Sequence, residues 1–201
     1  DNYPDLIWAI GGRNKEKLQQ IRSDLNLNCD VVVADGADID ALKLMTSKTK
    51  VVLSTAGPFA RYGSLLVQAC VEEGSHYTDI TGENHWVKGL IDKHHDEAAS
   101  KGIRIIPSCG YDSIPSDIGA FFTISQFNKP VSRVDVYHEA QGGASGGTTE
   151  TIFTMDGVGK EMRDPFVLNP KETISDEQRE NSKDGFKVEK VDGLEGWAGV
   201  G

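Results

Sequence analysis

The hydrophobic positions of the chain fall into short apolar runs separated by segments of helical periodicity. Apolar runs bounded by glycine, proline or aspartate are typical of strands buried in a parallel sheet. Five segments have this character or its more polar variant: 6–10, 31–33, 51–54, 76–80 and 103–106. Because parallel strands need crossover connections, and helical crossovers cover both faces of a sheet, the alternation predicts an α/β fold. We expect a Rossmann-type, doubly wound parallel sheet.

Local signals indicate where the intervening helices begin and end. Asn14 is expected to cap the helix that carries Leu18, Ile21 and Leu25, because its side-chain oxygen can accept from a first-turn amide. Gly74 is expected to close a later helix in a left-handed conformation. Further helices are expected over 39–45, 86–100 and about 115–122.

The pattern changes near residue 127. Val131, Val134, Val136 and Tyr137 suggest a strand, which a glycine-rich loop follows. Beyond Asp164 the chain is polar and charged, with no closing element in the pattern. We therefore expect residues 1–126 to form the Rossmann-type domain and residues 127–201 to begin a second, incomplete α+β domain.

The first visible strand does not look like the first strand of a Rossmann domain. In a Rossmann domain the first strand lies in the middle of the sheet and leads into a G-x-G-x-x-G turn. No such turn precedes Leu6. We interpret 6–10 as the second strand and expect the central strand and its glycine turn upstream of Asp1. This predicts a gap in the sheet between 6–10 and 51–54, and poor dinucleotide binding by the chain as written. One alternative stays open, in which Gly11 and Gly12 are the phosphate turn.

Charged residues that follow the predicted strands are candidates for cofactor binding. Arg13, followed by Asn14, stands where an acidic residue would bind the adenosine ribose of NAD, and a cation there suits the 2′-phosphate of NADP. The sequence thus favours NADP over NAD, unless Arg13 is only a solvated residue at a helix start. Asp35 could accept from the adenine amine or could simply form the turn before Gly36.

Two acidic residues follow the fourth strand. Asp79 and Glu83 could form a catalytic pair of carboxylates, but residues of this kind more often cap a helix or bind loop amides. We expect Asp79 to be structural and Glu83 to be exposed. The five histidines form no metal-ligand pattern, and adjacent His94 and His95 are expected to be solvated.

Two later segments are candidates for the substrate side. Tyr111 and Asp112 follow the fifth strand; they are weak candidates for lining the substrate pocket or acting in catalysis, although Asp112 or Ser113 could instead cap the next helix. A glycine-rich loop follows later, and its backbone amides could bind an anion, or it could be a linker. The loop residues assigned to the substrate side are Gly143, Ser145, Gly146 and Gly147.

An ordered set of motifs resembles the saccharopine dehydrogenase-like oxidoreductases, which include the trans-acting enoyl reductases. The segments that carry the resemblance are WAIGGRNKEKL at 8–18, STAGPF at 54–59 with Tyr62 and Gly63, YTDITGE at 77–83, GYDSIPSD at 110–117 and GGASGGT at 142–148. The resemblance covers about residues 6–165 and implies NAD(P) chemistry. It also implies that Ala56, Gly57, Pro58 and Phe59 lie against the ribose and nicotinamide side of the cofactor.

Composition argues against several classes of function and site. A net charge of −10 without a basic stripe argues against nucleic acid. Three scattered cysteines argue against a disulfide framework or a zinc site and favour a reducing compartment. No apolar run reaches the roughly 18–20 residues that span a bilayer. We expect a protein of the cytoplasm or the cytosolic face of a membrane, and leave a homodimer open.

The function expected from these observations is an NADP-dependent oxidoreductase. It would transfer hydride to or from a small-molecule or lipid-type substrate, with no resident metal. The competing hypothesis is a non-catalytic module that keeps the nucleotide-binding fold but acts through protein or membrane-surface contacts, because a fold alone does not establish an activity.

Overall fold

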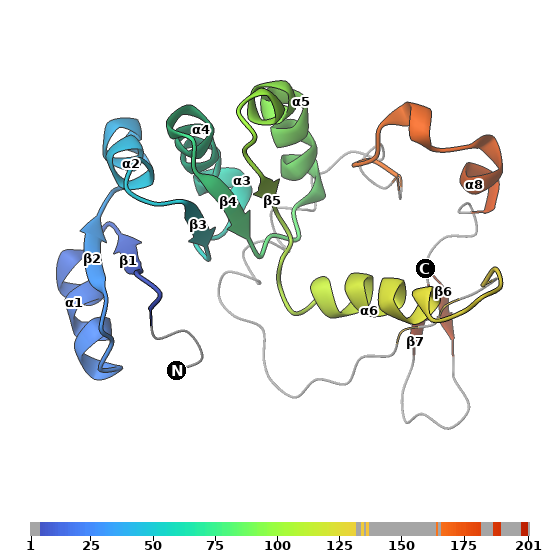
Figure 1. Ribbon diagram of the computed structural model, residues 1–201, viewed down its shortest axis with the longest axis horizontal. Helices are drawn as coiled ribbons and strands as arrows, with labels where there is room; N and C mark the ends of the chain where they lie inside the picture. The colour runs from blue at the N-terminus through green and yellow to red at the C-terminus, as the bar shows by residue number, and fades with distance from the viewer. Residues whose placement is uncertain are drawn as a thin grey trace. The chain divides into compact units, whose positions relative to one another are not determined.

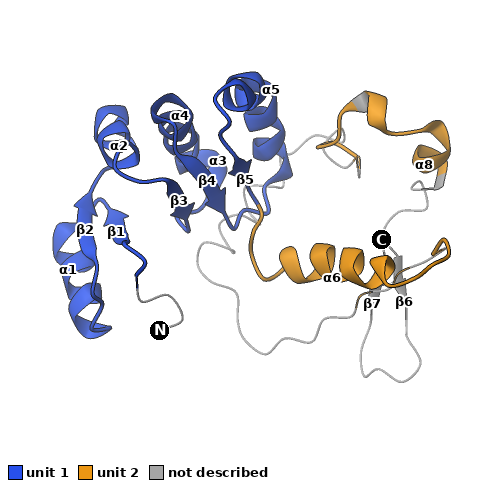
Figure 2. Ribbon diagram, in the orientation of Figure 1, with its two compact units in different colours: residues 1–107 blue, residues 108–201 orange. Residues whose placement is uncertain are grey.

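The computed structural model describes residues 5–131, 134, 136, 164, 166–181, 187–189 and 198–200. The chain divides into two compact units, residues 1–107 and 108–201 (Figure 2). The units therefore divide earlier than the expected domain boundary at residues 126 and 127. That domain assignment stays a prediction, since few residues beyond the boundary are described.

Strands and helices alternate along unit 1 (Figure 1). They are β1 (Ala9–Gly12), α1 (Lys15–Asp24), β2 (Asp30–Val33), α2 (Ile39–Thr46), β3 (Val51–Ser54), α3 (Phe59–Tyr62), α4 (Ser64–Glu73), β4 (His76–Asp79), α5 (Asn84–Ser100) and β5 (Ile105–Ile106). Helix α1 begins, and helix α4 ends, where the capping residues in the sequence predict. The Asn14 side chain accepts from the Lys17 amide at 2.8 Å, and Gly74 closes α4 with a φ of 85°.

The strands form two parallel groups that are not hydrogen-bonded to each other. β1 pairs with β2, and β3, β4 and β5 form a three-stranded sheet in that order. Among the described residues no backbone pairing joins β1 to β3. The sequence of strands β2-β1, then β3-β4-β5, is the doubly wound order 3-2-1-4-5-6 with its central strand left out. The predicted fold class is thus confirmed, and the absence of pairing between β1 and β3 among the described residues agrees with the predicted gap, which stays a prediction.

The first strand lies further along the chain than its apolar residues indicate. We expected a strand over 6–10 ended by two glycines, but Gly11 and Gly12 pair with Val32 and Val33 inside the strand. Ile7 is 95% exposed and precedes the strand. Because Gly11 and Gly12 are strand residues, the alternative in which they form the phosphate turn is wrong.

The two glycines of β1 show how helices cover both faces of the strands. A Cβ on Gly11 would lie 3.2 Å from the Met45 sulfur in α2, whereas a Cβ on Gly12 would lie 3.6 Å from Leu18 in α1. Neighbouring residues of a strand face opposite sides. Helices α1 and α2 therefore lie on opposite faces, as a doubly wound fold requires, and the small strand residues allow both to approach closely.

Helix α2 joins the two groups of strands. Leu42 of α2 packs with Ala34 after β2 and with Ala69 of α4 in one buried cluster. Inside α4, Val67, Cys70 and Val71 are fully buried. The core thus runs along the α2–α4 contact and under α4, which holds β1 and β2 beside β3 without a shared hydrogen bond.

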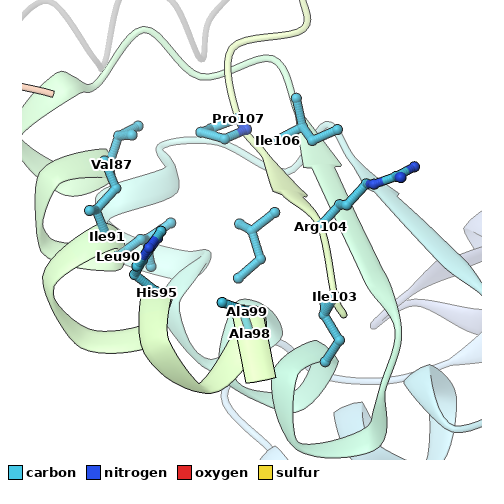
Figure 3. A pocket seen from close by; sticks show the side chains of 11 residues that line it. Val87, Leu90, Ile91, His95, Ala98, Ala99, Ile103, Arg104, Ile106 and Pro107 are labelled. Atoms are coloured by element: carbon cyan, nitrogen blue, oxygen red, sulfur yellow. The ribbon is translucent and has the colours of Figure 1, made fainter. Parts of the chain in front are cut away.

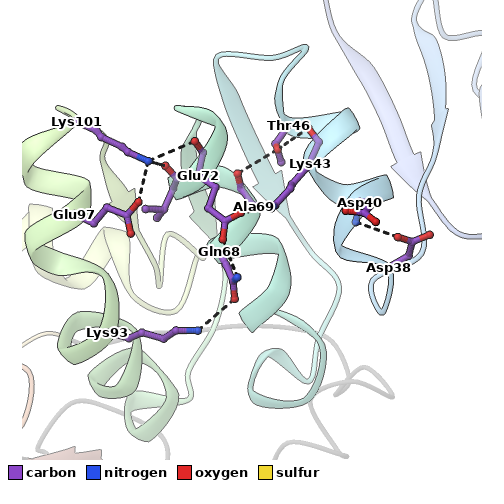
Figure 4. A network of polar contacts seen from close by, with 11 residues as sticks. Asp38, Asp40, Lys43, Thr46, Gln68, Ala69, Glu72, Lys93, Glu97 and Lys101 are labelled. Carbon is purple, nitrogen blue, oxygen red and sulfur yellow. Dashed lines mark hydrogen bonds and ion pairs between the residues drawn. The ribbon is translucent and has the colours of Figure 1, made fainter.

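Charged side chains tie the outer surfaces of α2, α4 and α5 together (Figure 4). Lys43 forms an ion pair with Glu72, which also accepts from Gln68 at 2.8 Å. This pairing raises the pKa of Lys43 and lowers the pKa of Glu72. Lys101 of the α5 C-terminus donates to Glu97 at 2.8 Å and to the Val71 carbonyl at 2.9 Å. Polar contacts on this face therefore join α2 to α4 and α4 to the end of α5.

Unit 2 contains α6 (Ile114–Ser125), a 3₁₀ turn η2 (Lys171–Thr173), α8 (Asp176–Asn181), β6 (Lys187–Glu189) and β7 (Ala198–Val200). Val131, Val134 and Val136 lie outside any strand, so the strand suggested there is wrong at these residues. Strands β6 and β7 form an antiparallel pair that the charged sequence did not predict.

Candidate functional site

The carboxyl ends of the parallel strands carry the candidate site in unit 1. Strands β1 and β2 lead into Arg13 and Asp35, and β3 leads into the turn at 55–58. A Cβ on Gly36 would lie 3.9 Å from the Tyr62 carbonyl oxygen at the end of α3. The loop that follows β2 is therefore close to the end of α3, at the edge where ligands bind in open α/β sheets.

The turn after β3 presents its backbone to solvent. Thr55, Ala56 and Gly57 are exposed, whereas Pro58 and Phe59 are buried, and the Gly57–Pro58 peptide bond is cis. The Gly57 amide donates to the Thr55 carbonyl at 3.2 Å. The arrangement suits the approach of a ligand to the turn, with Phe59 anchoring it from below.

A buried carboxylate holds the end of this turn. Glu83 is 1% exposed, and its two oxygens accept from the Phe59 amide at 2.7 Å and the Ala60 amide at 3.0 Å. These amides open α3, whose N-cap residue Pro58 makes no side-chain hydrogen bond to them. Glu83 therefore caps α3 from 24 residues away. Our expectation that Glu83 is exposed is wrong.

Three more buried polar residues support Glu83. The Thr81 hydroxyl accepts from the Glu83 amide at 3.1 Å, and the Thr81 amide donates to Asp79 at 3.0 Å. The Tyr77 hydroxyl donates to the other Asp79 oxygen at 2.8 Å. Residues 77, 79, 81 and 83 alternate with more exposed residues, so one side of this segment forms a continuous polar chain. Asp79 is structural, as expected.

Aromatic packing fixes α3 against α5. Phe59 and Trp86 stack with ring centroids 5.8 Å apart, and the Trp86 indole donates to Ser64 at 2.9 Å. A Cβ on Gly63 would lie 2.7 Å from Trp86 and 2.8 Å from the Phe59 carbonyl. Only glycine fits between these groups. The sequence motif Tyr62-Gly63 is therefore explained by packing at Gly63.

The residues after β1 and β2 form the open side of the same edge. Arg13 is exposed and has no ion-pair partner in the described part of the chain. Asn14 uses its side-chain oxygen to cap α1. Asp35 forms a turn in which one of its carboxylate oxygens accepts from the Ala37 amide at 2.9 Å. Arg13 is therefore available for an anion, and the predicted cofactor roles of all three residues stay predictions.

The remaining candidates lie in unit 2. Tyr111 and Asp112 are exposed, and Ser113 is the N-cap residue of α6 without a side-chain bond to its amides. Gly143, Ser145, Gly146 and Gly147 lie outside the described residues. The substrate-side assignments of these residues stay predictions.

Burial shifts the pKa values of three titratable groups near the sheet. Burial raises the pKa of the Cys70 thiol to about 12. Burial, and then the charge of Asp79, raise the pKa of Tyr77 above its usual range. Cys70 is a free, buried thiol. His94 is also buried, contrary to our expectation, and burial lowers its pKa.

A cavity of about 310 Å³ lies between α5 and β5 (Figure 3). Its walls are mainly aliphatic, with Leu90, Ala98 and Ile103 among them, and His95 and Arg104 at its border. None of the residues predicted to bind the cofactor lines it. The predicted cofactor site and this cavity are therefore formed by different residues.

The described residues hold neither a metal-ligand cluster nor a membrane-spanning helix. Within them, no cluster of histidine, cysteine and acidic side chains could hold a metal ion. None of the helices described has the length and apolar character needed to traverse a bilayer.

Comparison with known proteins decides the family. Residues 2–106 match the model of the saccharopine dehydrogenase NADP-binding domain. The chain belongs to this family. The match agrees with the NADP preference that Arg13 indicates. It also places β1 to β5 within the family's cofactor-binding domain.

Several relatives carry names from the same group of oxidoreductases. A mouse saccharopine dehydrogenase-like oxidoreductase is 37% identical over 150 residues, which is 70% of this chain and 35% of that protein. A trans-acting enoyl reductase of Mycobacterium leprae is 42% identical over 116 residues, 56% of this chain and 28% of that protein. A lipid droplet localized protein of Caenorhabditis elegans is 31% identical over 165 residues, 76% of this chain and 39% of that protein. The chain thus spans between about a quarter and two fifths of these relatives' lengths.

A solved structure shows the same fold. The apo saccharopine dehydrogenase (L-Glu forming) of Saccharomyces cerevisiae superposes with a TM-score of 0.52 at 16% identity. The superposition covers 61% of this chain and 26% of the yeast protein. At this identity the likeness concerns the fold alone.

Proposed function

We propose that this chain supplies the NADP-binding domain of an oxidoreductase that transfers hydride to or from a small-molecule or lipid-type substrate. The family match and the names of the relatives support the oxidoreductase class. Names such as enoyl reductase and lipid droplet localized protein favour a lipid-type substrate. The nicotinamide ring would supply the hydride chemistry, and the chain would bind and orient the dinucleotide.

One observation carries the choice of NADP. Arg13 is exposed immediately after β1, next to the point at which the strand order reverses. A guanidinium there can form charge-assisted hydrogen bonds to a 2′-phosphate, which NAD lacks. Across the same edge, the open backbone at Ala56 and Gly57 would receive the ribose and nicotinamide side. The residues present therefore fit an NADP dinucleotide.

The decisive experiment exchanges the charge of Arg13. In the natural full-length protein, Arg13→Glu should weaken NADPH binding roughly 10–100-fold, since hydrogen bonds to charged groups contribute about 1.5–3 kcal/mol. Binding of NADH, measured by the same fluorescence titration, should change little. Arg22→Glu, in the last turn of α1, is the matched control and should leave both affinities unchanged.

Other outcomes would count against the proposal in different ways. An equal loss of NADPH and NADH binding in Arg13→Glu would remove the 2′-phosphate role of Arg13. A wild-type protein that binds neither dinucleotide would support the competing hypothesis, a non-catalytic module acting through protein or membrane-surface contacts. The cytosolic or membrane-surface location and a homodimer remain part of the proposal and are tested by fractionation and light scattering.

A further inference from the structure

We propose that Glu83 is a positioning residue for the nicotinamide half of the dinucleotide. The proposal rests on the proposed function and adds a named residue to it. Glu83 accepts from the amides of Phe59 and Ala60, which come shortly after the exposed turn at 55–57. Through these bonds the carboxylate fixes where the turn leaves β3 and how its backbone faces the edge of the sheet.

The geometry of Glu83 makes it specific for this task. A carboxylate presents two acceptor oxygens, and each of them receives one amide within 3.0 Å. A glutamine of the same size keeps one acceptor but places an NH₂ group against the second amide, which is itself a donor. The site therefore distinguishes a carboxylate from its amide isostere by hydrogen bonding, with almost no change in volume.

A buried chain of hydrogen-bonded polar groups fixes the position of Glu83. Tyr77, Asp79 and Thr81 are each at most 1% exposed, and each bonds to the next along the chain. Backbone of β4 carries this chain up to the carboxyl edge, parallel to β3. The position of the turn after β3 is thus set from the neighbouring strand.

Packing keeps α3 in place independently of Glu83. Phe59 stacks on Trp86, and Trp86 fills the space above Gly63. Loss of one amide bond should therefore loosen the turn while α3 stays attached to α5. This separates a positioning role from a purely structural one and makes the proposal testable by ligand binding.

The test compares two ligands in the natural full-length protein. NADPH carries both halves of the dinucleotide, whereas 2′,5′-ADP carries the adenosine 2′-phosphate half and no nicotinamide. In Glu83→Gln, NADPH affinity should fall about tenfold, as expected for one charge-assisted hydrogen bond, while 2′,5′-ADP affinity stays within about twofold. Glu73→Gln, an exposed acid at the end of α4, should change neither affinity.

The remaining outcomes decide against the proposal or against its premise. Unchanged NADPH affinity in Glu83→Gln, or an equal loss for both ligands, would overturn the positioning role. If Glu83→Gln does not fold, Thr81→Val decides; it should lower NADPH affinity about threefold and spare 2′,5′-ADP, and no change would overturn the role. A wild-type protein that binds neither ligand would instead contradict the proposed function.

Discussion

The two groups of strands in unit 1 are built with very different degrees of burial. Around β3 to β5, helix α4 buries four residues and α5 buries five. Around β1 and β2, helix α1 has no buried residue, and Leu6, Ile7 and Trp8 are exposed. The difference follows from the strand order, since β1 has a paired neighbour on one side only, whereas β4 is paired on both.

The same contrast extends to the carboxyl edge. The β3–β4 side supplies backbone whose conformation is held by buried groups, with Glu83 at the centre. The β1–β2 side supplies exposed charges, Arg13 and Asp35, on short loops. A dinucleotide can use both, because backbone can approach it closely at a fixed turn and a guanidinium can pair with its 2′-phosphate.

The largest expected effect comes from breaking the contact between the two groups. Leu42 is 3% exposed at the α2–α4 contact, so Leu42→Ala should lower the free energy of unfolding by about 2–5 kcal/mol in urea titrations. Leu44, on the same helix and 61% exposed, is the control, and Leu44→Ala should change the free energy by less than about 0.5 kcal/mol. Equal effects would show that α2 does not join the two groups as described.

A second test addresses only the group of strands β3 to β5 and the helices packed on it. Gly63→Ala adds a methyl group where Trp86 and the Phe59 carbonyl leave no space, and should cost about 1–3 kcal/mol. Gly89→Ala, on the exposed side of α5, meets nothing within 4 Å and should stabilise the protein by roughly 0.5–1 kcal/mol. Thermal unfolding should thus shift in opposite directions, and a stabilising Gly63→Ala would contradict the close packing of α3 on α5.

The smallest expected effect is the pH dependence of stability that His94 of α5 introduces. Burial, and then Lys93, lower the pKa of His94 below its ordinary value of 6.5. Its contribution to stability is therefore complete above pH 6.5 and is lost as the pH falls, because the unfolded chain takes up the proton first. His94→Gln should reduce the loss of stability between pH 7.5 and 6. The exposed neighbour variant His95→Gln should retain it, and identical profiles for both variants would contradict the assignment.

Elements with strong local signals could be predicted from the sequence. Asn14 at the start of α1 and Gly74 at the end of α4 act as expected, because capping depends on residues within one turn. The first strand was placed too early because Leu6 and Ile7 have strand-forming side chains, whereas Gly11 and Gly12 do not. Their place in β1 depends on α1 and α2 approaching from both sides, which is not a local property.

The sequence alone determined the alternation of strands and helices and the order of the motifs, and these predicted the family and its NADP cofactor, whereas the role of Arg13 stays a prediction. Only the tertiary structure decided which polar residues are buried. Glu83 and His94 were expected at the surface, since charged and imidazole side chains usually remain hydrated. Glu83 is inside because two backbone amides, brought from 24 and 23 residues away by the pairing of β3 with β4, replace its water.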